Sequence, residues 1–141
     1  MSLSSEIKKI TVPAIIDMKN RGERISALTA YDYLFASLLD QAGIDIILVG
    51  DSGAMVFSGH KNTLPLTMDE AIYHCRAAKR GIHRALLVAD MPFMSFQVTV
   101  KDALLNAGRF FKEAHVEAVK VEGGEEIAET ILRMVNCGMP V

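Results

Sequence analysis

The sequence predicts an α/β protein with a parallel sheet, amounting to about half of an eightfold (β/α)8 TIM barrel. Strand-like apolar runs alternate with helical patterns along all 141 residues, as expected for successive βα units. Three of these runs end in an acid, namely Asp51, Asp90 and Glu122. Because the loops after parallel strands open onto one shared face, we expect these three carboxylates to meet there.

The order of the elements is an amino-terminal helix, four strand–helix units and the start of a fifth strand, all within one domain spanning residues 1–141. A full barrel of this kind has roughly 250 residues, so the chain corresponds to the amino-terminal half. The expected helices are residues 12–21, 31–41, 67–80, 100–114 and 125–136, and the expected strands are residues 24–30, 44–50, 85–89, 116–121 and, cut short, 139–141.

Capping residues mark most of the helix boundaries. A threonine stands at the N-cap position of three expected helices, and in two of them an acid follows three residues later, as in a capping box. A glycine follows the end of four helices, where it can stop the helical backbone. The threonines are Thr11, Thr67 and Thr99, and the glycines are Gly22, Gly43, Gly81 and Gly138.

Periodicity supports the same elements. Apolar residues recur at helical spacing over residues 31–42 and again over Val100–Ala114. The strands are short apolar runs, as is usual for parallel strands covered on both faces. The connection at residues 51–65 is longer than an ordinary βα loop, which favours a functional role for it.

A small open parallel sheet is the structural alternative to a barrel. Such sheets usually bind ligands through a glycine-rich phosphate turn after the first strand. Residues 28–32 read Leu-Thr-Ala-Tyr-Asp and contain no glycine. The barrel is therefore the favoured fold.

Composition restricts the classes of function. Half of the residues are hydrophobic and the formal net charge is -2, with no basic block, so we expect no nucleic-acid partner and a small substrate. No apolar run approaches membrane-spanning length and no signal-peptide core is present, which favours a soluble cytoplasmic protein that does not bind membranes. Cys75 and Cys137 lie far apart and are expected to be buried thiols.

The alternation of side chains along a strand points to a charged site. Lys120 and Glu122 are two residues apart, so they share one face of their strand. At the mouth of a barrel they would face the strand ends that carry Asp51 and Asp90. Three carboxylates this close repel one another unless a cation lies among them.

The donor set favours Mg²⁺, because a hard divalent ion prefers oxygen ligands. Such an ion, chelated by a 2-oxo acid, would polarise the ketone, and Lys120 would neutralise the substrate carboxylate or the developing enolate. Simpler interpretations stay open: each acid could cap a loop, Ser52 could cap a turn, and Lys120 could pair with Glu122 in solvent. His60 fits a site residue or a plain loop residue equally well.

Five motifs in register resemble the ketopantoate hydroxymethyltransferase (3-methyl-2-oxobutanoate hydroxymethyltransferase) family. They agree in order and spacing from about residue 11 to residue 141. The motifs are Thr-Ala-Tyr-Asp-Tyr at residues 29–33, Val-Gly-Asp-Ser at 49–52, Gly-His at 59–60 with Thr-Leu-Pro at 63–65, Ala-Asp-Met-Pro-Phe at 89–93, and Lys-Val-Glu-Gly-Gly at 120–124.

This resemblance implies a barrel of the phosphoenolpyruvate mutase-like group, assembled as a homo-oligomeric decamer. It implies transfer of a hydroxymethyl group from 5,10-methylenetetrahydrofolate to 3-methyl-2-oxobutanoate, through a Mg-bound enolate, to give 2-dehydropantoate for pantothenate biosynthesis. Carried over by motif, Asp51, Asp90 and Glu122 form the Mg²⁺ shell, and Asp51, Ser52, Asp90 and Lys120 form the 2-oxo acid site. The general base of the family is a glutamate in the carboxy-terminal half, so residues 1–141 alone are expected to contain no general base and to be inactive.

The chain departs from the family pattern at several loop positions. Gly53 and Ala54 stand where the family usually has Leu-Gly, Lys61 and Asn62 replace Asp-Ser, and His115 occupies a customary glycine position. Two other functions stay open at this point. One is a related Mg-dependent 2-oxo acid lyase or mutase, and the other is a non-catalytic half-barrel that binds a partner.

Overall fold

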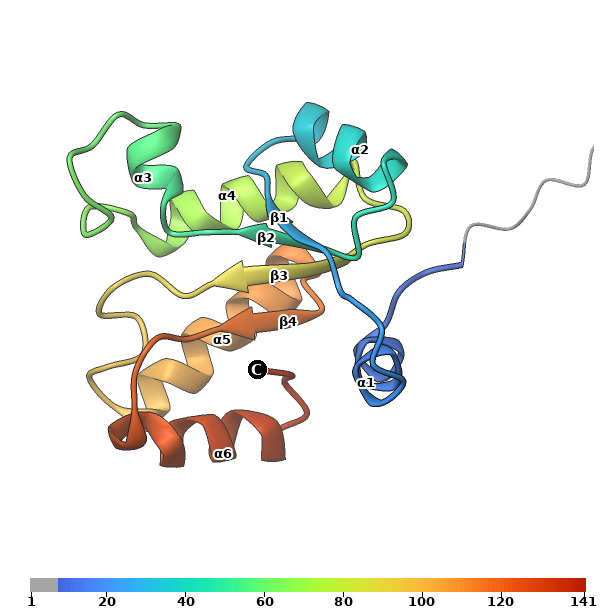
Figure 1. Cartoon of the computed structure of the whole chain (residues 1–141). Coiled ribbons are helices and arrows are strands. Elements are labelled where there is room, and N and C mark those ends of the chain that lie inside the picture. Colours follow the sequence, from blue (N-terminus) through green and yellow to red (C-terminus); the bar gives the residue numbers. More distant parts are fainter. Residues whose placement is uncertain (1–7) are drawn as a thin grey trace, which may run out of the picture.

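The computed structural model describes residues 8–141 and shows a four-stranded parallel sheet in the order β1-β2-β3-β4 (Figure 1). The α/β architecture expected from the sequence is confirmed. The strands are β1 (Ala27–Thr29), β2 (Ile46–Val49), β3 (Leu86–Asp90) and β4 (Ala118–Lys120), and the helices are α1 (Val12–Asn20), α2 (Tyr33–Gln41), α3 (Gly53–Val56), α4 (Met68–Lys79), α5 (Val100–Ala114) and α6 (Ala128–Asn136), with a 3-10 turn, η1 (Glu125–Ile127), before α6.

Each strand pairs with the next strand along the chain, and a helix connects each pair. Helices α2, α4, α5 and α6 line one side of the sheet, whereas α1 lies near the end where the strands begin (Figure 1). This succession of βα units is the arrangement of half of a (β/α)8 barrel. The carboxyl ends of all four strands therefore lie at the same end of the sheet.

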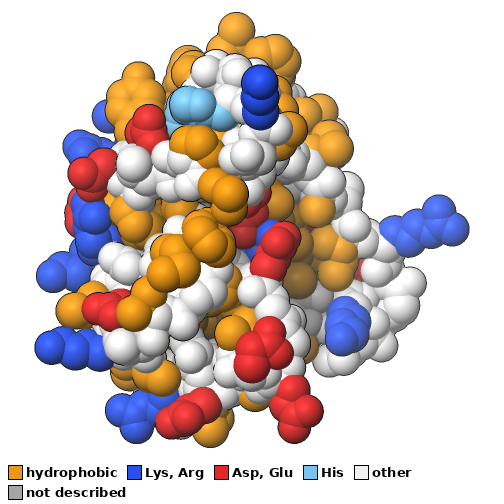
Figure 2. Space-filling view, turned by 90° about the vertical axis from the view of Figure 1, so that its left-hand side faces the viewer, with side chains coloured by type: hydrophobic (Ala, Val, Ile, Leu, Met, Phe, Trp, Pro, Cys, Tyr) orange, Lys and Arg blue, Asp and Glu red, His pale blue; other side chains and the backbone are white. Residues whose placement is uncertain are grey.

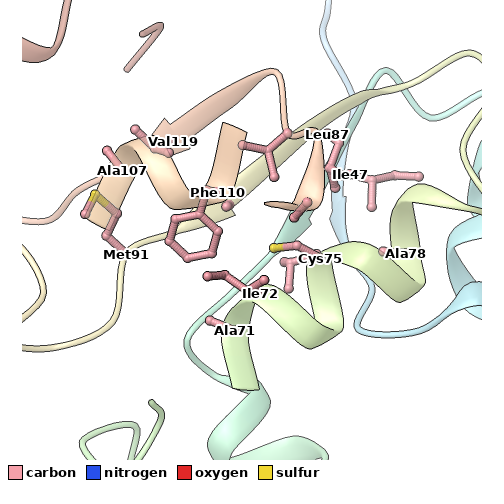
Figure 3. Close-up of a cluster of buried hydrophobic side chains, with 14 of the residues drawn as sticks. Ile47, Ala71, Ile72, Cys75, Ala78, Leu87, Met91, Ala107, Phe110 and Val119 are labelled. Carbon is pink, nitrogen blue, oxygen red and sulfur yellow. The ribbon is translucent and has the colours of Figure 1, made fainter. Parts of the chain in front are cut away.

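The core lies between the sheet and helices α4 and α5 (Figure 3). Ile47 and Leu87 from the strands meet Cys75 of α4 and Phe110 of α5, and each of these four side chains is fully buried. A buried side chain the size of Phe110 contributes about 2–3 kcal/mol to folding through removal of apolar surface from water. This packing against α4 and α5 fixes the positions of β2 and β3, and the candidate site lies at the carboxyl ends of these strands.

Helix boundaries follow the predicted caps closely. The capping box of Thr67 and Glu70 is formed in full, and the Thr11 and Thr99 side chains accept hydrogen bonds from the first turns of α1 and α5. Helix α4 ends directly before Gly81, as expected, and this glycine also has a packing role. A Cβ on Gly81 would lie 2.5 Å from the Tyr33 carbonyl oxygen, so the missing side chain lets α2 pack closely against the end of α4.

Several expectations differ from the structure. The long connection contains α3, which the sequence did not reveal because four residues are too short to show a period. Residues 139–141 form no strand, although the Val119 amide donates a hydrogen bond to the Pro140 carbonyl beside β4. Cys75 is buried as expected, but the expectation for Cys137 is wrong, because that thiol is exposed on the turn after α6.

The apolar stripe over residues 31–42 predicts α2 correctly, yet much of it faces outward. Leu34, Phe35 and Leu38 are 61%, 59% and 52% exposed, and the buried positions of α2 are Ala36 and Asp40. No helix among residues 8–141 has both the length and the apolar character needed to cross a membrane.

Candidate functional site

Four charged residues meet at the carboxyl ends of β2, β3 and β4. Asp90 and Lys120 are the last residues of β3 and β4 and are register partners, so their side chains lie next to each other on one face of the sheet. Asp51 follows β2 by two residues, and Glu122 follows β4 by two. Figure 2 views this end of the molecule, where acidic side chains and a basic one lie together near the middle, bordered by hydrophobic groups.

Lys120 joins two of the carboxylates. Its Nζ donates to Asp90 Oδ1 at 2.8 Å and to Glu122 Oε1 at 2.7 Å. The second oxygen of Asp90, Oδ2, accepts a hydrogen bond from the Asp51 amide at 3.2 Å. These contacts confirm the predicted arrangement, in which Lys120 and Glu122 share a face of the strand and lie beside Asp90.

Burial and hydrogen bonds together set the pKa values of this group. Asp90 is 5% exposed, and burial raises the pKa of its carboxyl group despite the hydrogen bonds from Lys120 and the Asp51 amide. Burial alone would lower the pKa of Lys120, but its hydrogen bonds to Asp90 and Glu122 raise it above its usual value. The same hydrogen bond from Lys120 lowers the pKa of the exposed Glu122 carboxyl. Lys120 consequently stays positively charged at the pocket.

A small pocket of about 120 Å³ opens beside these groups. Its lining is mixed and combines carboxylates with apolar side chains from the loops after β2 and β3. The residues that line it are Asp51, Thr63, Leu64, Asp90, Met91, Phe93, Phe96, Gln97 and Glu122. Thr63 and Leu64 belong to the long connection at residues 51–65, so that segment does contribute to the site.

Ser52 lies next to the pocket without lining it. It occupies the N-cap position of α3, but its side chain makes no capping hydrogen bond. Its Oγ instead lies 2.9 Å from the Tyr31 hydroxyl. Sequence reasoning did not select Tyr31, and the signal that could have done so is its place in the motif at residues 29–33.

A second, larger hollow lies at the opposite end of the sheet, beside α1. Its volume is about 340 Å³, and three of its basic side chains already pair with acids. These pairs are Lys9–Glu117, Arg21–Glu23 and Arg84–Asp45. The carboxyl-terminal pocket is the stronger candidate site, because three carboxylates line it at the ends of parallel strands.

The donor chemistry of the pocket suits a hard divalent cation, since Asp51, Asp90 and Glu122 supply only oxygen. As they stand, no three acidic, histidine or cysteine side chains within residues 8–141 lie close enough together to hold a metal ion. Oxygens of Asp90 and Glu122 bond to the Lys120 ammonium instead. A metal would have to replace that ammonium at Asp90.

A family model described as ketopantoate hydroxymethyltransferase matches residues 9–141. The chain belongs to this family. Three curated relatives named 3-methyl-2-oxobutanoate hydroxymethyltransferase illustrate the match. The relative from Syntrophus aciditrophicus is 53% identical over 141 residues, covering 100% of this chain and 52% of its own length. Those from Chlorobium luteolum and Syntrophotalea carbinolica are 54% and 57% identical, covering 94% and 95% of this chain and 49% and 50% of their own lengths.

The chain thus spans about half the length of the curated hydroxymethyltransferases it matches. The positions expected from the sequence to depart from the family pattern lie outside the charged group. Lys61 and Asn62 are exposed in the long connection, and Asn62 Oδ1 accepts a hydrogen bond from the Leu64 amide. His115 ends α5 in the left-handed conformation. Gly53 is buried under the Tyr31 ring.

Proposed function

We propose that the complete protein containing this chain transfers a hydroxymethyl group from 5,10-methylenetetrahydrofolate to 3-methyl-2-oxobutanoate and forms 2-dehydropantoate for pantothenate biosynthesis. Family membership and the names of the relatives support this assignment. The structural observation that carries it is the Asp90–Lys120 pair at the carboxyl ends of the strands, beside a pocket that Asp51, Asp90 and Glu122 line.

Lys120 is the residue that binds the anionic part of the 2-oxo acid. Its ammonium stays charged and its exposed fraction, 37% for the side chain, leaves it open to a ligand. As a proton leaves the carbon beside the ketone, negative charge develops on oxygen, and a fixed ammonium nearby stabilises that charge. Ser52 offers a hydroxyl group to the same substrate.

Asp51, Asp90 and Glu122 are the residues that would hold Mg²⁺, with Glu122 binding through water. When bound, the ion supplies the polarisation of the ketone that makes the neighbouring proton easier to remove. The Lys120 ammonium, which bonds to Asp90 and Glu122, would neutralise the substrate carboxylate beside that ion. The base that removes the proton is expected outside residues 1–141. The complete protein is expected to form a homo-oligomer.

Proton exchange and product formation test this proposal separately. The complete protein with Mg²⁺ should exchange the proton on C3 of 3-methyl-2-oxobutanoate for deuterium, and should form 2-dehydropantoate only when 5,10-methylenetetrahydrofolate is added. Lys120→Ala should slow exchange by at least about tenfold, because a positioned charge near the developing anion is lost. Lys101→Ala, on the exposed face of α5, is the matched control.

Three results would contradict the proposal. Absence of both exchange and product in the complete protein would rule out the reaction. Cleavage or rearrangement of the oxo acid without folate would assign the lyase or mutase chemistry instead. Wild-type exchange by Lys120→Ala would remove Lys120 from the site.

A further inference from the structure

The Ser52 hydroxyl group has a single side-chain partner within residues 8–141, the Tyr31 hydroxyl group at 2.9 Å. Tyr31 lies two residues after β1 and Ser52 three residues after β2, so this contact links the carboxyl ends of two neighbouring strands. Both residues are only partly buried. The pair therefore lies at the carboxyl-terminal edge of the sheet, where Tyr31 also packs against the core.

Two glycines make room for this pair. A Cβ on Gly50 would lie 2.7 Å from Ser52 Oγ, closer than real Cβ atoms come to another heavy atom. A Cβ on Gly53 would lie 3.1 and 3.2 Å from two carbons of the Tyr31 ring. The absence of a side chain at Gly50 therefore leaves space for the Ser52 hydroxyl, and its absence at Gly53 leaves space for the Tyr31 ring.

Tyr31 is itself held in place by α4. His74 Nδ1 lies 2.9 Å from the Tyr31 carbonyl oxygen and donates a hydrogen bond to it, since a carbonyl can only accept. The imidazole ring is 6% exposed and makes edge contacts with the rings of Tyr31, Phe57 and Tyr73. A buried histidine therefore fixes the backbone from which the tyrosine reaches Ser52.

We propose that Tyr31 is a positioning residue for 2-oxo acid binding, which it supports by holding the Ser52 hydroxyl in one orientation. A serine hydroxyl can rotate among three staggered positions, and ordering it in advance removes that entropic cost from substrate binding. When the Tyr31 hydroxyl donates to Ser52 Oγ, the hydrogen of Ser52 is free to point to an anionic oxygen of the substrate. This inference rests on the proposed function, because it requires Ser52 to bind the oxo acid.

A double-mutant cycle in the complete protein tests the link between the two residues. The affinity for 3-methyl-2-oxobutanoate is measured by titration calorimetry in wild type, Tyr31→Phe, Ser52→Ala and the double variant. Tyr31→Phe should weaken binding roughly three- to tenfold, the loss expected for one neutral hydrogen bond, at an unchanged melting temperature. The double variant should bind no more weakly than Ser52→Ala, because Tyr31 acts only through Ser52. Tyr33→Phe, whose ring is 56% exposed, is the control and should bind as wild type does.

The outcomes separate this inference from the proposed function. Two results would overturn the positioning role: wild-type affinity in Tyr31→Phe, or a loss of affinity in the double variant equal to the product of the two single losses. In either case, weaker binding by Ser52→Ala would still support the substrate site. Wild-type binding by Ser52→Ala would overturn the positioning role and also remove Ser52 from the proposed substrate site.

The glycine beside the ring gives a second, independent variant. Gly53→Ala should move the Tyr31 ring and weaken oxo acid binding in the same direction as Tyr31→Phe, but should cause no further loss when Tyr31 is already Phe. Gly108→Ala is the matched control, because a Cβ at this position of α5 meets no atom within 4 Å. An equal loss from Gly53→Ala in both backgrounds would show that position 53 acts without the tyrosine hydroxyl and would contradict the inference.

Discussion

Asp45 is a buried carboxylate directly before β2, at the opposite end of this strand from Asp51. It accepts hydrogen bonds from the Ser26 amide at 3.0 Å, from Ser26 Oγ at 2.8 Å and from Arg84 Nη2 at 2.8 Å. Burial alone would raise the pKa of Asp45, but these hydrogen bonds outweigh burial and hold it below its usual value. The residue therefore ties the start of β2 to the segments before β1 and β3 in its charged form.

We predict that Asp45→Asn lowers the free energy of unfolding by about 1–2 kcal/mol at neutral pH, as expected when hydrogen bonds to a charged group are weakened. An unfolded aspartate titrates near pH 4, and the folded pKa is lower, so the unfolded chain binds the proton first as the pH falls. The stabilisation is present above about pH 4 and is lost as the pH falls through the folded pKa. Urea unfolding at pH 7 and pH 3 measures the effect, and the deficit of the variant should shrink in acid.

Asp17→Asn, on the exposed surface of α1, is the control for this measurement. A deficit of Asp45→Asn that is the same at both pH values would contradict the role assigned to the carboxylate charge.

The residues of the site illustrate what a sequence alone can establish. Asp51, Asp90, Lys120 and Glu122 could be predicted to meet, because parallel strands share one carboxyl-terminal edge and strand side chains alternate. The Tyr31–Ser52 contact could not be predicted, since it depends on the backbone path through two loops. Whether the carboxylates bind Mg²⁺ stays a prediction, and the structure adds that Lys120 competes for them.

The elements of the sheet could be predicted from apolar runs and caps, whereas irregular segments could not. Helix α5 shows both cases. Its buried residues Ala103, Ala107, Phe110 and Ala114 follow the predicted helical spacing. Its end is unusual, because His115 has φ 53° and ψ 39°, the left-handed conformation in which glycine is favoured. A histidine in this conformation carries a small local strain.

We predict that His115→Gly raises the free energy of unfolding by about 1 kcal/mol, because glycine adopts the left-handed conformation without a steric penalty. Thermal or urea unfolding measures the gain. Lys112→Gly, three residues earlier within α5, should lower stability by about the same amount, as glycine does in a helix interior. A His115→Gly variant no more stable than wild type would show that the left-handed residue is not strained.

At the scale of the whole molecule, the uncovered surfaces within residues 8–141 include a strand edge and an apolar helix face. Strand β1 pairs only with β2 within this part of the chain, so its other edge has free backbone groups. Leu34, Phe35 and Leu38 form an exposed apolar face on α2. Exposed strand edges and apolar faces of this kind favour association between chains.

We predict that an isolated chain of residues 1–141 self-associates at micromolar concentration and that replacing both Leu34 and Leu38 by Lys reduces this association. Sedimentation velocity over a range of concentrations measures it. Asn20→Lys, an exposed position at the end of α1, adds charge elsewhere and should leave association unchanged. A monomer at every concentration before substitution would contradict the prediction.

The strand order β1-β2-β3-β4 also bears on how the chain folds as it leaves the ribosome. Each newly made strand adds to an edge that already exists, and no strand has to enter between two others that are already paired. The contacts that must form are therefore between neighbouring βα units. Each contact closes only the chain segment between two consecutive strands, so the conformational entropy lost is modest. Synthesis from the amino terminus can thus build the site one strand at a time, with Lys120 reaching Asp90 last, because its strand is the fourth to emerge.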